Sequence, residues 1–233
     1  MITCNIMVYC IQETWVVGNG SKLVRGHMVF WHNRERRVKC SKGRIPDGVD
    51  IILSPDAVEV WREAGTKSPI TTPRDSPFVG IFIGVNLSFS RLDPYERKVW
   101  GQLTLFFALV YHLVDDTENT EFIDKLISIM SLAPKTAEFI GGHDVNANLG
   151  IRTKMYRKTL GPWGIDNRNM KGKGLLGIFS HNQLKVTNSF FKKPSFVTWR
   201  SFNKARSPHM LDVISVSDTF SNTWETAGCR QRA

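Results

Sequence analysis

Short apolar runs alternate with polar loops along most of the chain. Seven of these runs are rich in β-branched and aromatic residues and are bounded by Gly, Pro, Asn or Asp, a pattern typical of strands. The predicted strands cover residues 6–11, 48–54, 78–89, 103–111, 138–141, 184–189 and 211–216.

Three other stretches predict helices. Residues 56–63 follow Ser54-Pro55, a cap with proline in the first turn. Residues 118–131 place apolar side chains on one face, with Asn119 or Thr120 as the expected cap, and residues 171–181 carry an apolar L-L-G-I-F face. Strand pairs flank each helix, which predicts an α/β sandwich of packed sheets with helices outside.

The composition of the 233 residues is that of a folded domain, with 42% hydrophobic and 22% charged residues. The four cysteines have no C-x-x-C spacing, which excludes a zinc ribbon or disulfide framework and favours a reducing compartment. The N-terminus lacks a signal-peptide pattern, and the longest apolar run, 103–114, is shorter than the about 20 residues that span a bilayer. We therefore expect an intracellular chain that is not secreted and has no membrane partner.

Charge is distributed unevenly. Residues 1–44 carry a net charge of +6, residues 45–150 carry −7 and residues 151–233 carry +11, which together make the net +10 of the chain. A basic C-terminal block beside an acidic middle predicts a surface for an anionic polymer, most simply nucleic acid. The alternative is a solubilising charged face.

Polar side chains that could carry chemistry stand where predicted strands end or begin. Asp144 and Asn146 follow two glycines and are two residues apart, so both face the same side of an extended segment. A carboxylate can take a proton from attacking water while a neighbouring amide donates to phosphate oxygens. The alternative is a turn in which Asp and Asn side chains bond their own backbone.

Four segments in order resemble the endonuclease/exonuclease/phosphatase family. They are I-Q-E-T-W around Glu13, V-Y at Tyr111, D-V-N-A from Asp144 and L-D-V-I around Asp212. Residues 167–199 resemble the branch of retroelement-type and craniofacial development protein 2-like endonucleases, in which N-x-N-G-x-x-L-L precedes L-x-x-T-N-x-x-F and T-W. The resemblance covers nearly the whole chain and implies a four-layer α/β sandwich, with two packed mixed sheets flanked by helices.

The resemblance implies a role for each matched residue. Glu13 would bind Mg²⁺ or Mn²⁺, and Tyr111 would donate to the scissile phosphate. Asp144 would orient or deprotonate the attacking water, Asn146 would hold that water and a phosphate oxygen, and Asp212 would orient a catalytic histidine. The plainer interpretations are a surface charge for Glu13, a half-buried strand residue for Tyr111 and a turn cap for Asp212.

The same segment supplies candidates for contact with nucleic acid, expected to be DNA. They are Asn167, Arg168, Asn169, Lys171, Lys173 and Trp199. Aromatic residues among lysines and arginines can stack on bases, although most aromatic strand residues belong to the core.

The sequence departs from the family pattern at two places, and both departures bear on whether the chain is expected to be active. The family's first strand, which ends in a metal-supporting asparagine, is missing, and the terminal S-D-H is replaced by a poor match at Ser217-Asp218-Thr219. We expect a partial domain over 1–216, incomplete at both ends, and an irregular tail over 217–233. His143 is expected to be a loop residue rather than a catalyst.

The predicted function is a metal-dependent phosphodiesterase that cuts nucleic acid as an endonuclease. Two alternatives remain open. One is a degenerate relative that at most binds nucleic acid, because loss of one member of a catalytic unit commonly lowers the rate by orders of magnitude. The other is a phosphatase of small or lipid phosphoesters.

Overall fold

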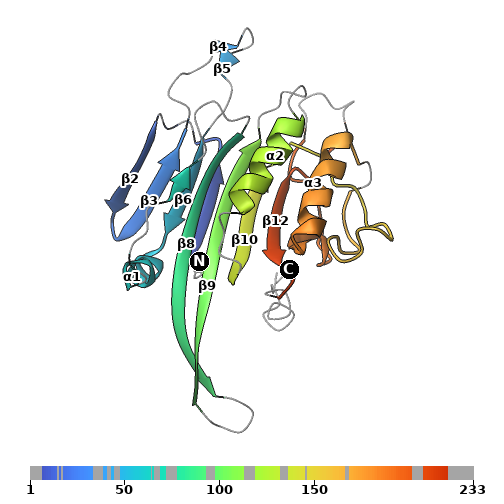
Figure 1. The fold of residues 1–233 in the computed structure, drawn as a ribbon. Coiled ribbons are helices and arrows are strands. Elements are labelled where there is room, and N and C mark those ends of the chain that lie inside the picture. Colours follow the sequence, from blue (N-terminus) through green and yellow to red (C-terminus); the bar gives the residue numbers. More distant parts are fainter. Residues whose placement is uncertain are drawn as a thin grey trace.

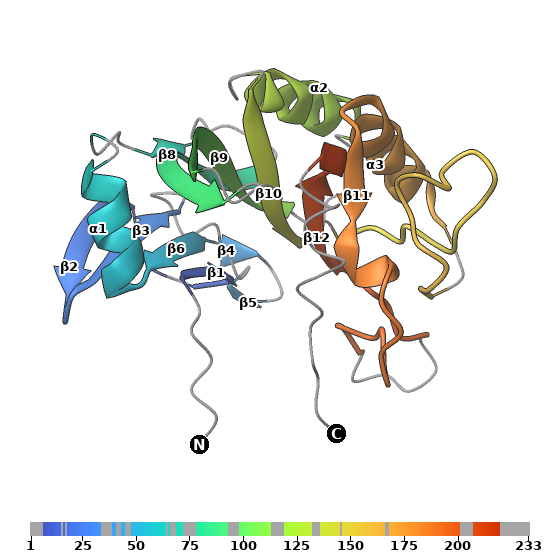
Figure 2. The same ribbon diagram turned by 90° about the horizontal axis from the view of Figure 1, so that it is seen from below.

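Two β-sheets packed against one another form the body of the molecule (Figures 1 and 2). This arrangement comes from a computed structural model of the chain. The residues that the structure describes are 7–14, 16, 18–33, 39–40, 43–44, 48–63, 65, 69–71, 78–92, 98–112, 119–131, 136–144, 146–165, 168–200 and 207–219.

The smaller sheet has four antiparallel strands. In spatial order they are β1 (Val8–Gln12), β6 (Val49–Leu53), β3 (His27–His32) and β2 (Asn19–Val24). A two-residue turn joins β2 to β3, and both of its residues, Arg25 and Gly26, have positive φ angles of 49° and 82°. Such a turn matches the twist of antiparallel strands. A separate small ribbon pairs β4 (Lys39–Cys40) with β5 (Gly43–Arg44).

The larger sheet has six strands and is mixed. Their spatial order is β11 (Leu184–Val186), β12 (Asp212–Ser217), β10 (Ala137–Asp144), β9 (Lys98–His112), β8 (Phe78–Leu92) and β7 (Ile70–Thr71). Only the β9–β10 pair is parallel, and α2 (Asn119–Met130) lies between these two strands in the chain. A parallel pair needs such a crossover because its strands start at the same end.

Strands β8 and β9 form a hairpin that extends past the rest of the sheet (Figure 1). They pair over their full 15 residues, whereas β10 pairs with β9 only from Thr104 to Tyr111. The end of the hairpin that stays within the sheet is the one that carries Tyr111.

The first helix and the smaller sheet share one core. Helix α1 (Pro55–Glu63) begins where the Ser54 hydroxyl accepts a hydrogen bond from the backbone N–H of Ala57 at 3.2 Å. Trp61 of this helix meets the ring of Phe30 edge to face at 5.3 Å, and Ile83 of β8 belongs to the same buried cluster. The sheets are therefore joined by apolar packing on the inner face of the smaller one.

Helices α2 and α3 (Met170–His181) cover the opposite face of the larger sheet (Figure 2). The core beneath them includes Leu126 from α2, Leu175 and Phe179 from α3, and Val110 from β9. All four side chains are at most 2% exposed, and among the described residues the buried cluster to which they belong is the larger of the two.

The predicted α/β class, with two packed sheets and flanking helices, is confirmed. The structure differs from the expectation in that the smaller sheet is purely antiparallel rather than mixed. Among the described residues no helix covers the outer face of that sheet, where Tyr9 and Ile11 are 37% and 41% exposed. None of the described helices is long and apolar enough to cross a membrane.

Six of the predicted strands correspond closely to β1, β6, β8, β9, β10 and β12, and the three predicted helices are all present. The strand predicted over 184–189 stops at Val186 and continues as a 3₁₀ turn over Thr187–Ser189. Asn119 and Thr120, expected as the cap of α2, lie within its first turn. The β2–β3 hairpin is not among the predicted strands. The glycine and polar residues of β2 hide its pattern, but the apolar run H-M-V-F-W-H of β3 and the turn glycine were usable signals.

Candidate active site

Three of the predicted site residues lie side by side on three neighbouring strands of the larger sheet. Asp144, the last residue of β10, pairs with Tyr111 near the end of β9 and with Asp212 at the start of β12. The parallel β9–β10 pair and the antiparallel β10–β12 pair bring these strand termini to one edge. Positions 111, 144 and 212, far apart in the sequence, therefore meet. The side chain of Tyr111 lies outside the described part of the structure.

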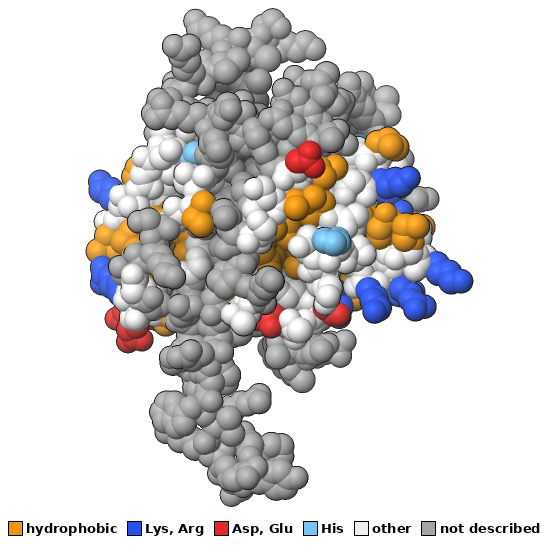
Figure 3. Space-filling view, viewed as in Figure 1, with side chains coloured by type: hydrophobic (Ala, Val, Ile, Leu, Met, Phe, Trp, Pro, Cys, Tyr) orange, Lys and Arg blue, Asp and Glu red, His pale blue; other side chains and the backbone are white. Residues whose placement is uncertain are grey.

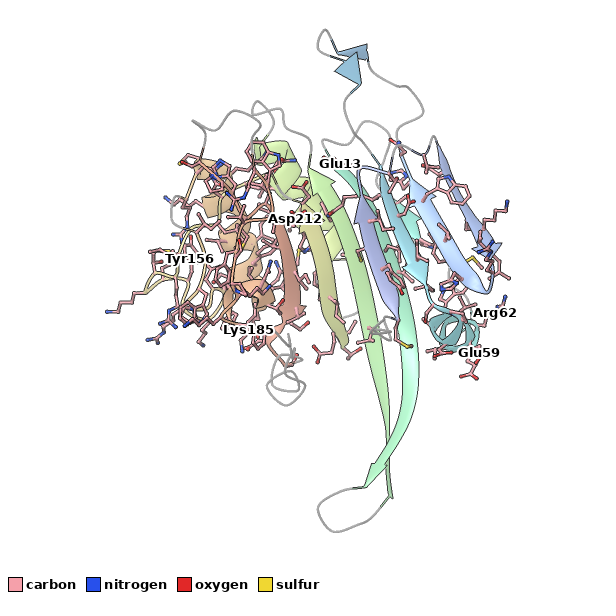
Figure 4. All side chains as sticks on the ribbon, turned by 180° about the vertical axis from the view of Figure 1, so that it is seen from behind. Glu13, Glu59, Arg62, Tyr156, Lys185 and Asp212 are labelled. Atoms are coloured by element: carbon pink, nitrogen blue, oxygen red, sulfur yellow. The ribbon has the colours of Figure 1, made fainter. Side chains whose placement is uncertain are left out.

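Glu13 reaches the same edge from the other sheet. It follows β1 directly and has a left-handed φ of 57°, and the preceding Gln12 donates from Nε2 to the carbonyl of Val110 at 3.4 Å. Val110 is the neighbour of Tyr111 in β9, so this hydrogen bond ties the end of β1 to the row of site residues. Figure 4 shows Glu13 and Asp212 at the same end of the sheets.

The carboxylates act on one another electrostatically. The pKa of Asp144 is raised to about 6, mainly because burial disfavours its charged form. The backbone N–H of Asn146 opposes this shift, the negative charges of Asp212 and Glu13 add to it, and the positive charge of Lys171 lowers it. A carboxylate with a pKa near neutrality can accept a proton and still be largely ionised at pH 7.

The loop after β10 adopts the turn that the sequence analysis considered as the alternative. The backbone N–H of Asn146 donates to Oδ1 of Asp144 at 3.1 Å, and Asn146 has a left-handed φ of 43°. Ala147 and Leu149 anchor the loop in the core, with 0% and 1% exposure. The turn engages one oxygen of Asp144 and is compatible with a chemical role for the other.

The N-terminus of α3 is docked on this loop. Asn169 caps the helix, because its Oδ1 accepts from the N–H of Gly172 at 2.8 Å, and the same oxygen accepts from the N–H of Asn148 at 3.2 Å. The Asn169 N–H in turn donates to the carbonyl of Asn148 at 3.2 Å. Lys171, in the first turn, is only 7% exposed.

The remaining predicted nucleic-acid contacts have varied surroundings. Arg168 donates from Nε to the carbonyl of Leu149 and from Nη2 to that of Ile151, each at 2.7 Å. Lys173 is exposed, and Trp199 is 39% exposed and stacks on His209 with ring centroids 5.7 Å apart. Asn167 lies outside the described residues.

Two residues that the sequence analysis did not select hold Asp212 in place. Oγ1 of Thr198 accepts from the N–H of Asp212 at 3.1 Å, and Nδ2 of Asn188 donates to the carbonyl of Asp212 at 2.9 Å. Oδ1 of Asn188 also accepts from the N–H of Ile214 at 3.1 Å. Asn188 and Thr198 are the N and T of the T-N-x-F-F and T-W motifs, so those motifs position the start of β12.

Ser217-Asp218-Thr219 lies at the opposite end of β10 from the carboxylates. Oγ of Ser217 accepts from the N–H of Phe139 at 2.6 Å, and Thr219 donates to Glu138 at 2.7 Å. Asp218 is paired with Lys185 at 2.6 Å. Because Glu138 and Phe139 stand at the start of β10 and Asp144 at its end, this tripeptide belongs to a surface ion-pair and hydrogen-bond group.

His143 lies within β10 rather than in a loop. Successive strand residues point to opposite faces, so His143 faces α3 while Asp144 faces the other side. The imidazole is 2% exposed, contacts Oγ of Ser215 through Nε2 at 2.7 Å and lies against the ring of Phe179 at 5.6 Å. Burial lowers its pKa to about 4, so it is neutral at pH 7.

The neutral state of His143 predicts acid sensitivity. Its pKa is about 4 when folded and near 6.5 when unfolded, so its contribution to stability is complete above about pH 6.5 and is lost as the pH falls toward 4. We expect His143→Gln to reduce the loss of unfolding free energy between pH 7 and pH 5 by about 1–2 kcal/mol. Urea titrations at pH 7 and pH 5 measure this change in unfolding free energy, and His181→Gln, at an exposed histidine, is the control. An unchanged pH dependence in His143→Gln would contradict the assignment.

The donor chemistry at this edge suits a hard divalent cation. Glu13, Asp144 and Asp212 offer carboxylate oxygens, although no three His, Cys, Asp or Glu side chains in the described residues are arranged to hold one ion together. Mg²⁺ usually takes one or two protein carboxylates and completes its shell with water and substrate phosphates. The donor chemistry of these carboxylates is therefore compatible with a divalent cation, although the described residues do not form a complete ligand set.

No protein-family model and no curated protein matches the chain. Among solved structures, the endonuclease domain of TRAS1, a telomere-specific non-LTR retrotransposon, is 15% identical, with a TM-score of 0.49 over 93% of this chain and 75% of that domain. The human Nocturnin catalytic domain is 12% identical, with a TM-score of 0.43 over 82% of this chain and 60% of its own.

An endonuclease/exonuclease/phosphatase family protein from Leptotrichia buccalis C-1013-b is 14% identical, with a TM-score of 0.45 over 82% of this chain and 58% of its own. The chain thus spans about three fifths of the Nocturnin domain and of the Leptotrichia protein. The proposed family assignment of this chain rests on its ordered sequence motifs.

Proposed function

We propose that the chain is a Mg²⁺-dependent phosphodiesterase that hydrolyses nucleic acid, with DNA as its substrate. The observation that carries this proposal is the convergence of Glu13, Asp144 and Asp212, from three separate sequence motifs, at one edge of the two sheets. Their order along the chain supports a place in the retroelement-type and craniofacial development protein 2-like branch of the endonuclease/exonuclease/phosphatase family.

Each of these residues has a separate role in hydrolysis. Glu13 would hold the divalent cation, which supplies charge neutralisation at the phosphate. Asp144 takes a proton from water as the water oxygen bonds to phosphorus, and its raised pKa of about 6 suits that step. The Asn146 amide donates to a phosphate oxygen. The ester oxygen leaves phosphorus and takes a proton from solvent.

The charge of the C-terminal half supports nucleic acid as the substrate. Four exposed basic side chains, Arg152, Lys154, Arg157 and Lys158, follow the loop that carries Asp144 and Asn146 in the sequence. Figure 3 shows Lys and Arg side chains gathered on the side of the molecule formed by its C-terminal half. Basic side chains neutralise backbone phosphates and give binding that weakens with salt.

A Mg²⁺-dependent nicking assay on supercoiled plasmid tests the proposal. We expect the full chain to nick DNA with Mg²⁺ and not with EDTA, and Asp144→Ala to lower the rate by at least about 10³-fold, as for loss of a member of a catalytic unit. Equal nicking by both proteins would reject the proposed active site.

A second candidate function is binding of nucleic acid without cleavage. It is favoured by the position of Ser217-Asp218-Thr219, which lies far from the carboxylates and so does not supply the S-D-H group of the family. Salt-dependent DNA binding together with no Mg²⁺-dependent nicking would favour this alternative.

A further inference from the structure

Lys171 is a buried lysine at the candidate active site. Its side chain is 7% exposed, which is rare for a lysine. Two residues further along the same helix, Lys173 is exposed. The burial is therefore particular to position 171.

The backbone around Lys171 is tightly held. The cap residue Asn169 is joined to Asn148 by hydrogen bonds in both directions, 3.2 Å each. Gly172 lies so close to the loop that a Cβ there would be 1.9 Å from the carbonyl oxygen of Asn148. Because Asn148 is four residues from Asp144, these contacts fix Lys171 relative to the catalytic loop.

The charges around Asp144 indicate what the ammonium group of Lys171 can do. Asp212 and Glu13 both act on Asp144 with negative charge, and Lys171 is the described residue that acts on it with positive charge. When a divalent cation and a phosphodiester bind at this site, Lys171 is the described cationic side chain whose charge acts on Asp144 beside the phosphate. An ammonium at such a position is a point charge suited to phosphate oxygens.

We propose that Lys171 is a catalytic residue whose ammonium binds a non-bridging oxygen of the scissile phosphodiester beside Asp144. This role deepens the proposed function and rests on it. It differs from general contact with the DNA backbone, which exposed lysines such as Lys173 provide. Lys171 stays protonated throughout, and its charge is most useful when negative charge builds up on the phosphoryl oxygens.

The charge-matched pair Lys171→Met and Lys22→Met tests this role. Lys22 is exposed in β2 and belongs neither to the candidate active site nor to the candidate nucleic-acid contacts. Each variant removes one positive charge and keeps an unbranched stem, so both change the net charge equally. We expect Lys171→Met to lower kcat for Mg²⁺-dependent nicking by about 10²–10³-fold with a much smaller change in KM, as when one preorganised transition-state donor is removed. Lys22→Met should keep kcat, and Lys171→Arg should recover most of it. Nicking by Lys171→Met at the rate of Lys22→Met would overturn the proposal.

A second measurement does not depend on cleavage. In the presence of Mg²⁺, inorganic phosphate should raise the unfolding temperature of the wild type and of Lys22→Met, and should not raise that of Lys171→Met. An equal phosphate effect in all three proteins overturns the role of Lys171. Absence of nicking by the wild type, with the phosphate effect present and dependent on Lys171, would instead reject the hydrolase function and keep the phosphate site.

Discussion

Replacing Gly172 with alanine should destabilise the protein by about 2 kcal/mol or more, because an added methyl group overpacks a rigid contact. Its Cβ would lie 1.9 Å from the carbonyl oxygen and 2.6 Å from the carbonyl carbon of Asn148. Both atoms are backbone, so no side-chain rotation can relieve the clash. The N-terminal turn of α3 must move away from the catalytic loop, and the bonds between Asn169 and Asn148 must stretch or break.

The matched control is Gly177→Ala in the same helix. An added Cβ at Gly177 meets no atom within 4 Å, so the substitution should show the ordinary helical preference for alanine and stabilise by about 0.5–1 kcal/mol. Urea unfolding of the two variants beside the wild type measures both effects. Equal stability of the two variants would show that α3 does not dock on the loop. We also expect Gly172→Ala, and not Gly177→Ala, to lose nicking activity, since Lys171 moves with the turn.

Asp144→Asn should abolish cleavage and at the same time stabilise the fold at pH 7. The raised pKa of about 6 means that the folded state holds a proton on Asp144 that the unfolded chain, at about 3.8, has already released. The stabilising effect of that proton is complete below about pH 3.8 and is lost as the pH rises through 6. At pH 7 the ionised carboxylate therefore opposes folding.

The expected gain for Asp144→Asn is about 1–2 kcal/mol at pH 7, reduced for the solvent that reaches this half-buried group. Asparagine keeps an oxygen that can accept from the N–H of Asn146, so the turn is preserved. Thermal unfolding at pH 7 and pH 5 measures the gain, which should shrink at the lower pH. The exposed Asp56→Asn, in the first turn of α1, is the control and should show no such gain.

Divalent cation should reverse this order of stability. A bound Mg²⁺ would reduce the repulsion between the carboxylates of Glu13 and Asp144. Added Mg²⁺ should therefore raise the unfolding temperature of the wild type more than that of Asp144→Asn, because a ligand stabilises the state that binds it. If Asp144→Asn is less stable than the wild type at pH 7 without metal, the view that the ionised carboxylate of Asp144 opposes folding is wrong.

The local pattern was sufficient for most elements of the fold. Of the seven strands that the apolar runs predicted, six correspond closely to strands of the structure, and the Ser54-Pro55 signal placed the start of α1 within one residue. The pattern failed at the edge strand β2, which is rich in glycine and polar residues and is held by pairing across the Arg25-Gly26 turn, whereas the apolar run of β3 was a signal that the prediction did not use. It also misplaced His143, whose polar ring is buried by contacts from Ser215 and Phe179 that no local rule contains.

The candidate site likewise depends partly on the local sequence and partly on the tertiary structure. Residue type and motif order were enough to select Glu13, Asp144 and Asp212, because each follows or begins an apolar run and carries a carboxylate. Their meeting depends on the parallel pairing of β9 with β10, the antiparallel pairing of β10 with β12 and the approach of β1. These contacts join residues up to 98 positions apart, and periodicity along the chain carries no information about them.

By itself the sequence determined the α/β class, the strand-end carboxylates and the basic C-terminal half. The tertiary structure alone decided that Asp144 has its raised pKa, that Asn188 and Thr198 hold Asp212, and that Lys171 is buried at the site while Lys173 is exposed. The reason is physical: the charge state and reach of a side chain depend on burial and on the charges around it, and both are set by segments that meet only when the sheets and α3 pack together.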